Sequence, residues 1–300
     1  MGAAEEPGGT VVTRWLVTGS GGILGHDVRT LLTDDQVTAL DRAALDITDP
    51  EAVRTAVSGH DVVINCAAWT DVDGAEAAEA TATAVNGTGV RHLAHACRDS
   101  GARLLHVSTD YVLPGDGTEP YSESAPTGPV NAYGRSKLAG ERAVAEILPD
   151  TGYIVRTAWL YGEHGQNFVA TMLGLAARRS TVEVVNDQYG QPTWTHDLAG
   201  LLVILGRADK APPGVYHATA TGHTTWYGLA RAAYELSGLD PDRVRPTASA
   251  AVPRPACRPA FSVLGHARWA AAGLPVLPDW RTSLAEALQR PSFTALVHRY

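Results

Sequence analysis

Residues 14–25 read RWLVTGSGGILG, a short apolar run that stops at a glycine-rich turn. The run 14–18 has the composition of a buried strand, and residues 23–32 have the pattern of a helix. The turn contains three evenly spaced glycines, Gly19, Gly22 and Gly25. Glycines at these places allow a tight turn, close approach of the backbone to a pyrophosphate and close packing of helix on strand. Such turns also form for steric reasons alone, but between a strand and a helix this one predicts dinucleotide binding at the helix start.

A second predicted strand, residues 36–40, ends at Asp41, about 20 residues beyond Gly22. A carboxylate there can bind the adenosine ribose and favours NADH, because it repels a 2′-phosphate. Arg42, its neighbour, could instead pair with the 2′-phosphate of NADPH. The sequence therefore leaves both cofactors open. Further along, Asp46 and Ile47 could contact the adenine ring or belong to the cap region of the next helix.

Strands and helices alternate over the first half of the chain. Further strands are expected at 61–65, 103–107 and 153–156, and further helices at 75–97, with a break near Asn86, and at 132–147. Another helix should begin at Pro50, with Asp49 as its N-cap. This alternation predicts an α/β fold, a doubly wound parallel sheet with helices on both faces. The near-continuous apolarity of the strands agrees, since both faces of such a sheet are buried.

The alternation decays after about residue 160. Prolines, among them Pro246, Pro253, Pro255 and Pro259, gather between 241 and 278, and we expect irregular structure there. We predict a flexible N-terminal tail at 1–12 and a dinucleotide-binding domain at 13–160, joined by segments that return at roughly 191–220. Residues 161–300 would mainly form a smaller C-terminal cap. A separate domain with its own function is the alternative, but no linker-like composition divides the halves.

Composition excludes several classes of protein. Lys and Arg total 24 against 32 Asp and Glu, a formal net charge of −8, which argues against nucleic-acid or anionic-membrane binding. No apolar run is long enough to cross a bilayer, and residues 1–10 do not resemble a secretory signal. Cys66, Cys97 and Cys257 are odd in number and widely spaced, which argues against a disulfide scaffold and a zinc site. We expect a cytoplasmic enzyme.

Tyr133 and Lys137 are four residues apart and would share one face of the predicted helix. A phenol, with a pKa of about 10, is a poor acid or base at neutral pH. A nearby ammonium and the positive ring of an oxidised nicotinamide would stabilise the phenolate and lower that pKa. A coincidental surface pair is the alternative, and the glycine turn upstream argues against it.

Ser108, Thr109 and Asp110 directly follow the fourth predicted strand. In a doubly wound sheet, the carboxyl ends of the strands line the ligand crevice. The Thr109 hydroxyl could therefore donate a hydrogen bond to a substrate carbonyl oxygen as charge develops on it. Taken alone, the motif is better explained as an ordinary Ser/Thr turn at a strand end.

In this order, the glycine turn, Ser108-Thr109-Asp110 and the Tyr133–Lys137 pair resemble the extended short-chain dehydrogenase/reductase superfamily. The chain is most similar to its dTDP-4-dehydrorhamnose reductase family, which implies a Rossmann fold of the extended type with a C-terminal substrate-binding cap. The similarity covers residues 15–290 and includes the blocks 65–73, 108–112, 131–141, 156–161 and 186–193.

The resemblance implies roles for individual residues. Tyr133 would be the proton donor, Lys137 would anchor the cofactor ribose and tune Tyr133, and Thr109 would polarise the C4 keto oxygen. The implied cofactor contacts are Gly22, Ile23, Leu24, Asp41, Asp46, Ile47, Ala67, Ala68 and Trp69. The implied contacts of the sugar nucleotide are Asp110, Trp159, Asn167, Phe168 and Gln191.

The implied reaction is the reduction, by NADPH or NADH, of the C4 keto group of a dTDP-4-keto-6-deoxy sugar. The favoured reaction is the reduction of dTDP-4-dehydro-L-rhamnose to dTDP-L-rhamnose. The alternatives are the same ketoreduction on another dTDP-4-keto-deoxysugar, of an antibiotic-sugar pathway, and a non-catalytic regulatory subunit. A dehydratase is disfavoured because Asp110 is followed by Tyr111 rather than by a second acidic residue.

The chain departs from the family pattern at two positions. Leu113 stands where an aromatic residue is usual, and Cys66 replaces a small residue. Some family members dimerise through Mg²⁺ held by carboxylates. We recognise no such ligands in this sequence, so we predict no metal, and a monomer or a homodimer.

Overall fold

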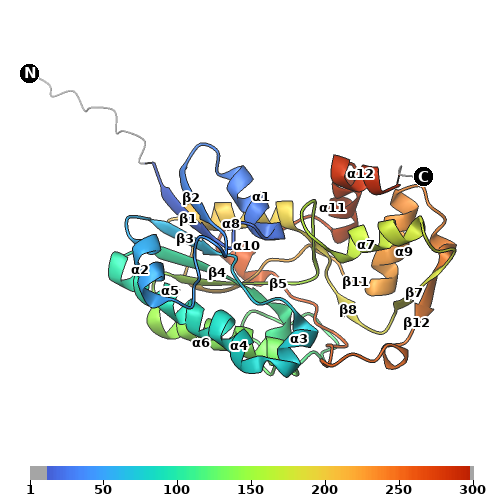
Figure 1. Cartoon of the computed structure of the whole chain (residues 1–300), viewed down its shortest axis with the longest axis horizontal. Coiled ribbons are helices and arrows are strands. Elements are labelled where there is room, and N and C mark those ends of the chain that lie inside the picture. Colours follow the sequence, from blue (N-terminus) through green and yellow to red (C-terminus); the bar gives the residue numbers. More distant parts are fainter. Residues whose placement is uncertain (1–11, 298–300) are drawn as a thin grey trace, which may run out of the picture.

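The main sheet consists of six parallel strands in the order β2-β1-β3-β4-β5-β10 (Figure 1). The computed structural model describes residues 12–297, so the predicted tail at 1–12 lies outside the described residues except for Val12. The strands are β1 (Arg14–Thr18), β2 (Gln36–Leu40), β3 (Val62–Asn65), β4 (Arg103–Thr109), β5 (Gly152–Thr157) and β10 (Gly214–His217). The predicted doubly wound parallel sheet is confirmed.

Helices cover both faces of this sheet (Figure 1). One face carries α1 (Ile23–Leu31), α8 (Thr195–Arg207) and α10 (Ala267–Ala271), and the other carries α2 (Pro50–Val57), α5 (Val90–Ser100) and α6 (Ala132–Ile147). Alternate strand residues enter the two cores: Trp15 and Val17 face α8, while Leu16 faces α2 and α5. This alternation is what the period-2 geometry of a strand requires.

Most of the predicted elements of the first half are confirmed. Asp49 caps α2, because its carboxylate accepts hydrogen bonds from the backbone N–H groups of Glu51 and Ala52. The long helix expected at 75–97 is wrong in part. The chain instead forms α3 (Val72–Ala77), α4 (Glu79–Thr83), a π-helical segment (Ala84–Gly89) and then α5. The break expected near Asn86 is this π segment, and Ala78, with φ −134°, adds a second break.

The C-terminal part packs around two hydrophobic clusters of its own. Its helices are α7 (Phe168–Ala176), α9 (Trp226–Leu236), α11 (Trp280–Ala287) and α12 (Pro291–Val297). Its short strands are β6 (Leu160–Tyr161), β7 (Val182–Val185), β8 (Tyr189–Gly190), β9 (Thr193–Trp194), β11 (Thr224–Thr225) and β12 (Val244–Thr247). The expectation of irregular structure around Pro246 is wrong, since this residue lies in β12. Proline is tolerated there because the β7–β12 sheet has only two strands, so β12 is an edge.

Within the described part of the chain, every helix is too short or too polar to span a lipid bilayer. Cys66, Cys97 and Cys257 are free thiols, as their spacing predicted.

The strand order reverses between β1 and β3, because the chain passes from β1 to β2 on one side and then crosses to β3 on the other. In open α/β sheets such a switch point opens a crevice at the carboxyl ends of the strands. The glycine turn after β1 meets the segment after β3 there. Gly19 has φ +67°, and a Cβ atom on it would lie 2.5 Å from the backbone nitrogen of Ala67. Glycine is therefore required at this junction.

Candidate active site

The glycine turn leaves the N-terminus of α1 open. Gly22 is the N-cap residue and provides no side-chain hydrogen bond to the helix. A Cβ atom on Gly25 would lie 2.4 Å from the carbonyl oxygen of Gly19, so the helix sits directly against the turn. The first N–H groups of α1 are therefore free to bind an anion, and the helix dipole favours negative charge there.

Asp41 lies next to this turn. A Cβ atom on Gly21 would be 3.3 Å from the Cβ atom of Asp41, and the Asp41 carboxylate accepts hydrogen bonds from the N–H groups of Ala43 and Ala44. Arg42 is exposed beside it. The structure thus places Asp41 beside the turn, and Arg42 directly follows it in the chain.

Asp46 and Ile47 have local structural partners. Asp46 accepts hydrogen bonds from the N–H and the hydroxyl group of Thr48, which lower the pKa of its carboxyl. Ile47 is buried in the core, where a Cβ atom on Gly89 would collide with it at 2.8 Å. A contact of this pair with adenine stays a prediction.

The segment after β3 is held by a buried amide that sequence reasoning gave no role. The Asn65 side-chain oxygen accepts hydrogen bonds from the Thr18 hydroxyl at 2.6 Å and from the Ala67 N–H at 3.1 Å. Its Nδ2 atom lies 2.9 Å from Nδ1 of the fully buried His106. Asn65 therefore connects the end of β1 and the middle of β4 to the segment 66–69, which carries the predicted nicotinamide contacts.

A second buried amide, Asn86 in the π segment, connects Trp69 to α6. The Asn86 amide exchanges hydrogen bonds with the backbone of Trp69 and donates to the Ser136 hydroxyl. Ser136 in turn donates to the carbonyl oxygen of Tyr133 at 2.7 Å. Trp69 and Tyr133 pack against the same small alanine cluster. π-Helical turns are frequent at functional sites, and this one fixes the separation of two predicted site residues.

Thr109, Asp110 and Tyr133 come together at the carboxyl end of β4. The Thr109 hydroxyl donates to Asp110 Oδ1 at 3.0 Å and accepts from the Tyr111 N–H at 3.2 Å. The Tyr133 ring packs edge-on against Tyr111, with 5.8 Å between ring centroids. Asn131, the N-cap of α6, places Tyr133 in the first turn of the helix. The structure therefore brings the three side chains together, and their catalytic roles stay a prediction.

The surroundings of this cluster raise the pKa values of both Tyr133 and Asp110. Burial and the neighbouring Asp110 raise the pKa of Tyr133, while hydrogen bonding with the Thr109 side chain opposes the rise. Burial raises the pKa of Asp110 to about 6, and the neighbouring side chains of Ser262 and Thr109 oppose the rise. The phenol is therefore protonated at neutral pH, as a proton donor must be.

Lys137 lies about one helical turn after Tyr133 in α6. Its ammonium group donates a hydrogen bond to the carbonyl oxygen of Val107 at 2.7 Å, and burial lowers its pKa to about 8. The expected lowering of the Tyr133 pKa by Lys137 together with an oxidised nicotinamide ring stays a prediction, and the fold by itself raises that pKa. The physical reason is that burial of the phenol dominates and the ammonium is engaged with Val107.

A buried ion pair supports the strand that carries Thr109. Glu141 and Arg156 form two hydrogen bonds of 2.7 and 2.9 Å, and their side chains are only 5% and 4% exposed. The Ser108 hydroxyl donates to Glu141 at 2.6 Å. The pair therefore holds β4, β5 and α6 together one residue before Thr109.

Trp159 and Phe168 belong to the hydrophobic cluster of the C-terminal part. The Trp159 ring stacks on Trp226 with 3.6 Å between centroids, and Phe168 packs on the same ring at 4.7 Å. Trp159 has φ +48°, and a Cβ atom on Gly190 would lie 2.4 Å from its ring. A non-glycine residue in this region of backbone space is held by its surroundings, which makes the position of the Trp159 ring well defined.

Asn167 and Gln191 are bound to the backbone around them. Asn167 caps α7 by accepting from the Ala170 N–H at 3.0 Å, and it donates to the Gly162 carbonyl at 2.9 Å. The Gln191 amide is buried and exchanges hydrogen bonds with the backbone of Leu264. Both side chains thus position loops, and a direct contact with substrate stays a prediction.

Two arginines that sequence reasoning missed reach the site from the C-terminal part. Arg258 and Arg254 pair with Asp73, at 3.0 and 3.4 Å. The same loop accepts a hydrogen bond at the Cys257 carbonyl from Asn131. Burial raises the pKa of Tyr111, and the positive charges of both arginines oppose that rise. No local sequence signal relates them to Asp73, because more than half of the chain separates them.

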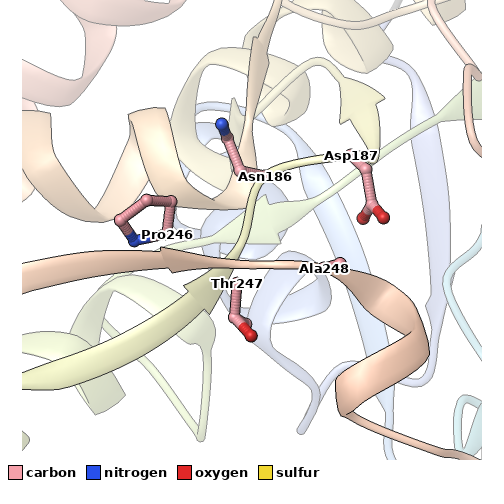
Figure 2. A pocket seen from close by; sticks show the side chains of 5 residues that line it. All are labelled: Asn186, Asp187, Pro246, Thr247 and Ala248. Carbon is pink, nitrogen blue, oxygen red and sulfur yellow. The ribbon is translucent and has the colours of Figure 1, made fainter.

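A shallow pocket of 330 Å³ lies between the ends of β7 and β12. Asn186, Asp187, Pro246, Thr247 and Ala248 line it, and Figure 2 shows their side chains pointing in different directions. The Asp187 carboxylate is occupied by the hydroxyl and N–H groups of Ser249. The pocket contains none of the predicted catalytic residues.

Comparison with known proteins gives matches over nearly the whole chain. The family model described as RmlD substrate binding domain matches residues 13–292. A dTDP-4-dehydrorhamnose reductase of Streptomyces griseus is 59% identical over 293 residues, 95% of this chain and 95% of that protein. A dTDP-4-keto-6-deoxy-D-glucose reductase of Streptomyces niveus is 52% identical over 278 residues, 91% of this chain and 96% of that protein.

A solved structure matches over a similar length. It is the dTDP-4-dehydrorhamnose reductase of Bacillus anthracis in complex with NADP, with a TM-score of 0.88 and 34% sequence identity. The match covers 93% of this chain and 99% of that chain.

Proposed function

The chain belongs to the dTDP-4-dehydrorhamnose reductase family, and from this premise we propose that it reduces the C4 keto group of a dTDP-4-keto-6-deoxy sugar. NADPH or NADH is the reductant. The observation that carries this proposal is the meeting of Thr109, Asp110 and a protonated Tyr133 at the carboxyl end of β4. The anion-binding start of α1 lies at the same edge of the sheet.

The residues present fit a dinucleotide. Gly22 leaves the start of α1 uncapped for a pyrophosphate, and Asp41 stands beside the turn where an adenosine ribose would lie. The Lys137 ammonium would hold the second ribose, and Ala67, Ala68 and Trp69 would border the nicotinamide. When bound, the reduced nicotinamide supplies the hydride.

Tyr133 and Thr109 would act on the keto oxygen as the hydride is added. Addition of hydride to C4 leaves negative charge on the former keto oxygen, and the barrier falls if a proton arrives as that charge develops. Tyr133 would donate its phenolic proton to this oxygen, and the Thr109 hydroxyl would turn from Asp110 to donate a hydrogen bond to it. The product is the C4 alcohol, and Tyr133 recovers its proton from solvent.

The C-terminal part would hold the nucleotide end of the substrate. Arg258 and Arg254 lie near Tyr111 and carry positive charge that suits a diphosphate. Asp73 now neutralises part of that charge, so the diphosphate would compete with it. Trp159, Asn167, Phe168 and Gln191, which we assign to the same half, would shape the pocket for the sugar and the base. In this assignment residues 161–300 act mainly as the cap.

Two substrates are supported by the comparisons. The Streptomyces griseus relative is named for dTDP-4-dehydrorhamnose, and the Streptomyces niveus relative for dTDP-4-keto-6-deoxy-D-glucose. We favour dTDP-4-dehydro-L-rhamnose, because the identity to the first relative is higher. Reduction of a different dTDP-4-keto-deoxysugar of an antibiotic pathway is the second candidate.

One experiment separates the two substrates. The purified protein is mixed with dTDP-4-keto-6-deoxy-D-glucose and NADPH, with and without a 3,5-epimerase, and loss of the reduced-nicotinamide absorbance is followed. Turnover that requires the epimerase, with L-rhamnose identified by NMR, supports the first substrate. Turnover without epimerase supports the second, and no turnover in either mixture contradicts ketoreduction of these sugars.

We further infer a cytoplasmic location and a monomeric or homodimeric state. The three free thiols support a reducing compartment. Sedimentation of the purified protein tests the oligomeric state directly.

A further inference from the structure

A group of potential metal ligands lies outside the site described above. His26 and Asp27 are in α1, and His164 is in the segment between β6 and α7. Each residue offers one donor atom, and these atoms all lie within 4.8 Å of one another. The two imidazole rings are 3.5 Å apart between centroids, and His164 Nε2 is 4.0 Å from Asp27 Oδ1. The three side chains therefore lie close together at one point, and a turn of the exposed His164 ring would let both imidazole nitrogens face one ion.

A second observation indicates that this point lacks a ligand. Asp27 is 7% exposed, and its Oδ2 atom is buried with no hydrogen-bond partner among residues 12–297. The Nδ1 atom of His26 is likewise buried without a partner in the described part of the chain. Buried polar atoms are almost always paired, so two orphaned atoms in one small cluster require an explanation. A cation between them would satisfy both.

We propose that His26, Asp27 and His164 bind one borderline divalent cation, with Zn²⁺ as the preferred ion. Imidazole nitrogens suit Zn²⁺, Co²⁺ and Ni²⁺, whereas Mg²⁺ prefers oxygen ligands in octahedral geometry. Three protein ligands leave the fourth tetrahedral position to water, which can enter because the His164 side chain is 40% exposed. This site differs in ligands and in metal from the carboxylate Mg²⁺ sites through which some family members dimerise.

The neighbouring acid, Glu163, is excluded from the ligand set. Its carboxylate accepts a hydrogen bond from Ser292 at 3.1 Å and lies 3.9 Å from Arg290. It is therefore engaged with the region of α12. Its charge still acts on His26 together with that of Asp27, and the positive charge of Arg29 opposes both.

A bound ion would fasten the segment 162–167 to α1. This segment ends at Asn167, the cap of α7, whose side chain also holds the Gly162 carbonyl. A ligand that binds only the folded chain raises its melting temperature. We therefore expect Zn²⁺ to stabilise the protein against heat, independently of whether the assigned substrate is correct.

The test uses the full chain without a polyhistidine tag, freed of metal by a chelator. Co²⁺ is titrated in while the visible absorption of tetrahedral Co²⁺ is followed, and Zn²⁺ binding is measured by calorimetry. We expect one ion per chain and a rise in melting temperature with Zn²⁺. His164→Gln should weaken binding at least about 10-fold, the scale for loss of an imidazole ligand or its support. His223→Gln, the same change at an exposed histidine elsewhere, should leave binding unchanged.

Several outcomes would overturn the proposal. These are no stoichiometric binding, equal binding by His164→Gln and the unchanged protein, or equal competition by Mg²⁺. Asp27→Asn provides a further check of the buried ligand. If this variant does not fold, His164→Gln still decides, because His164 lies in a partly exposed loop.

Discussion

The Thr109 hydroxyl donates a hydrogen bond to Oδ1 of Asp110 at 3.0 Å, while Oδ2 of the same carboxylate has no partner among the described residues. Asp110 is 2% exposed, so this carboxylate is half satisfied in a buried place. Its charged form is therefore costly to the folded chain, and its pKa is raised to about 6. This unfavourable buried charge lies next to Thr109, which would donate a hydrogen bond to the substrate oxygen.

The effect of Asp110→Asn on the free energy of unfolding should be more favourable at neutral pH than at acid pH. The folded pKa of Asp110 is about 6 and the ordinary value is 3.8, so the folded chain binds more protons between these values. The contribution of Asp110 to stability thus falls as pH rises from about 4 to about 6. The free energy of unfolding, measured in urea at about pH 4 and pH 7.5, should shift in favour of the variant by about 1–3 kcal/mol between the two conditions. An equal difference at both pH values would contradict a raised pKa.

Asp41 and Arg42 should have opposite effects on cofactor choice. Asp41 lies beside the glycine turn, where a ribose with or without a 2′-phosphate would lie, and the exposed Arg42 follows it in the chain. Asp41→Ala should weaken NADH binding more than NADPH binding, and Arg42→Ala should do the reverse. Dissociation constants from quenching of tryptophan fluorescence measure this. Equal losses for both cofactors in both variants would mean that these side chains do not distinguish the 2′ position.

Replacement of Asn167 should raise the KM of the sugar nucleotide more than the KM of the cofactor. It caps α7 and holds Gly162, so Asn167→Ala should cost about 1 kcal/mol of stability and raise the KM of the sugar nucleotide. Asn167→Ser keeps a capping hydroxyl but loses the amide. If the serine variant restores stability while the sugar KM stays high, the amide has a role in binding. A damaged cofactor KM with a normal sugar KM would assign Asn167 to the other half of the site.

Removing one member of the Glu141–Arg156 pair should lower the free energy of unfolding strongly, whereas replacing both members by apolar residues should lower it less than the two single changes together. Glu141→Gln leaves a buried guanidinium without its counter-charge and should cost about 3–5 kcal/mol. The double variant Glu141→Leu, Arg156→Met should lose less than the sum of its single variants, by urea unfolding. Glu146→Gln, which breaks the exposed pair with Arg91, is the matched control and should cost under about 1 kcal/mol. Additive effects at the buried pair would show that its members do not depend on each other.

Much of the fold could be predicted because its signals are local. The glycine turn, the apolar strands and the Asp49-Pro50 helix start each lie within a few residues of sequence. The break at Ala78 could not be predicted in this way, since alanine is the best helix former. The π segment is stabilised by Asn86 through contacts with Trp69 and Ser136, which are tertiary.

The candidate site likewise contains features with a local sequence signal and features that depend on tertiary contacts. Tyr133 and Lys137 share a helix face, and their spacing indicated them. Thr109 at its strand end was indicated only together with the glycine turn and the family resemblance. The partnership of Asp73 with Arg254 joins residues 181 positions apart. The raised pKa of Tyr133 was also beyond sequence reasoning, because it depends on how deeply the fold buries the phenol.

The central claim is that Tyr133 supplies the proton during ketoreduction. Tyr133→Phe keeps the ring and its packing on Tyr111 but removes the hydroxyl, so folding and NADPH affinity should be preserved. Thr109→Val, which removes one hydrogen bond to the developing oxyanion, is the comparison and should cost about 10-fold to 10³-fold in kcat.

The most direct measurement is the single-turnover rate of NADPH oxidation by Tyr133→Phe, with saturating dTDP-4-keto-6-deoxy sugar and the 3,5-epimerase present. Melting temperature and NADPH dissociation constant are recorded on the same preparation. A rate at least about 10²-fold below that of the unchanged protein, with both controls normal, is the predicted result. A near-normal rate would contradict the assignment of Tyr133 as the proton donor.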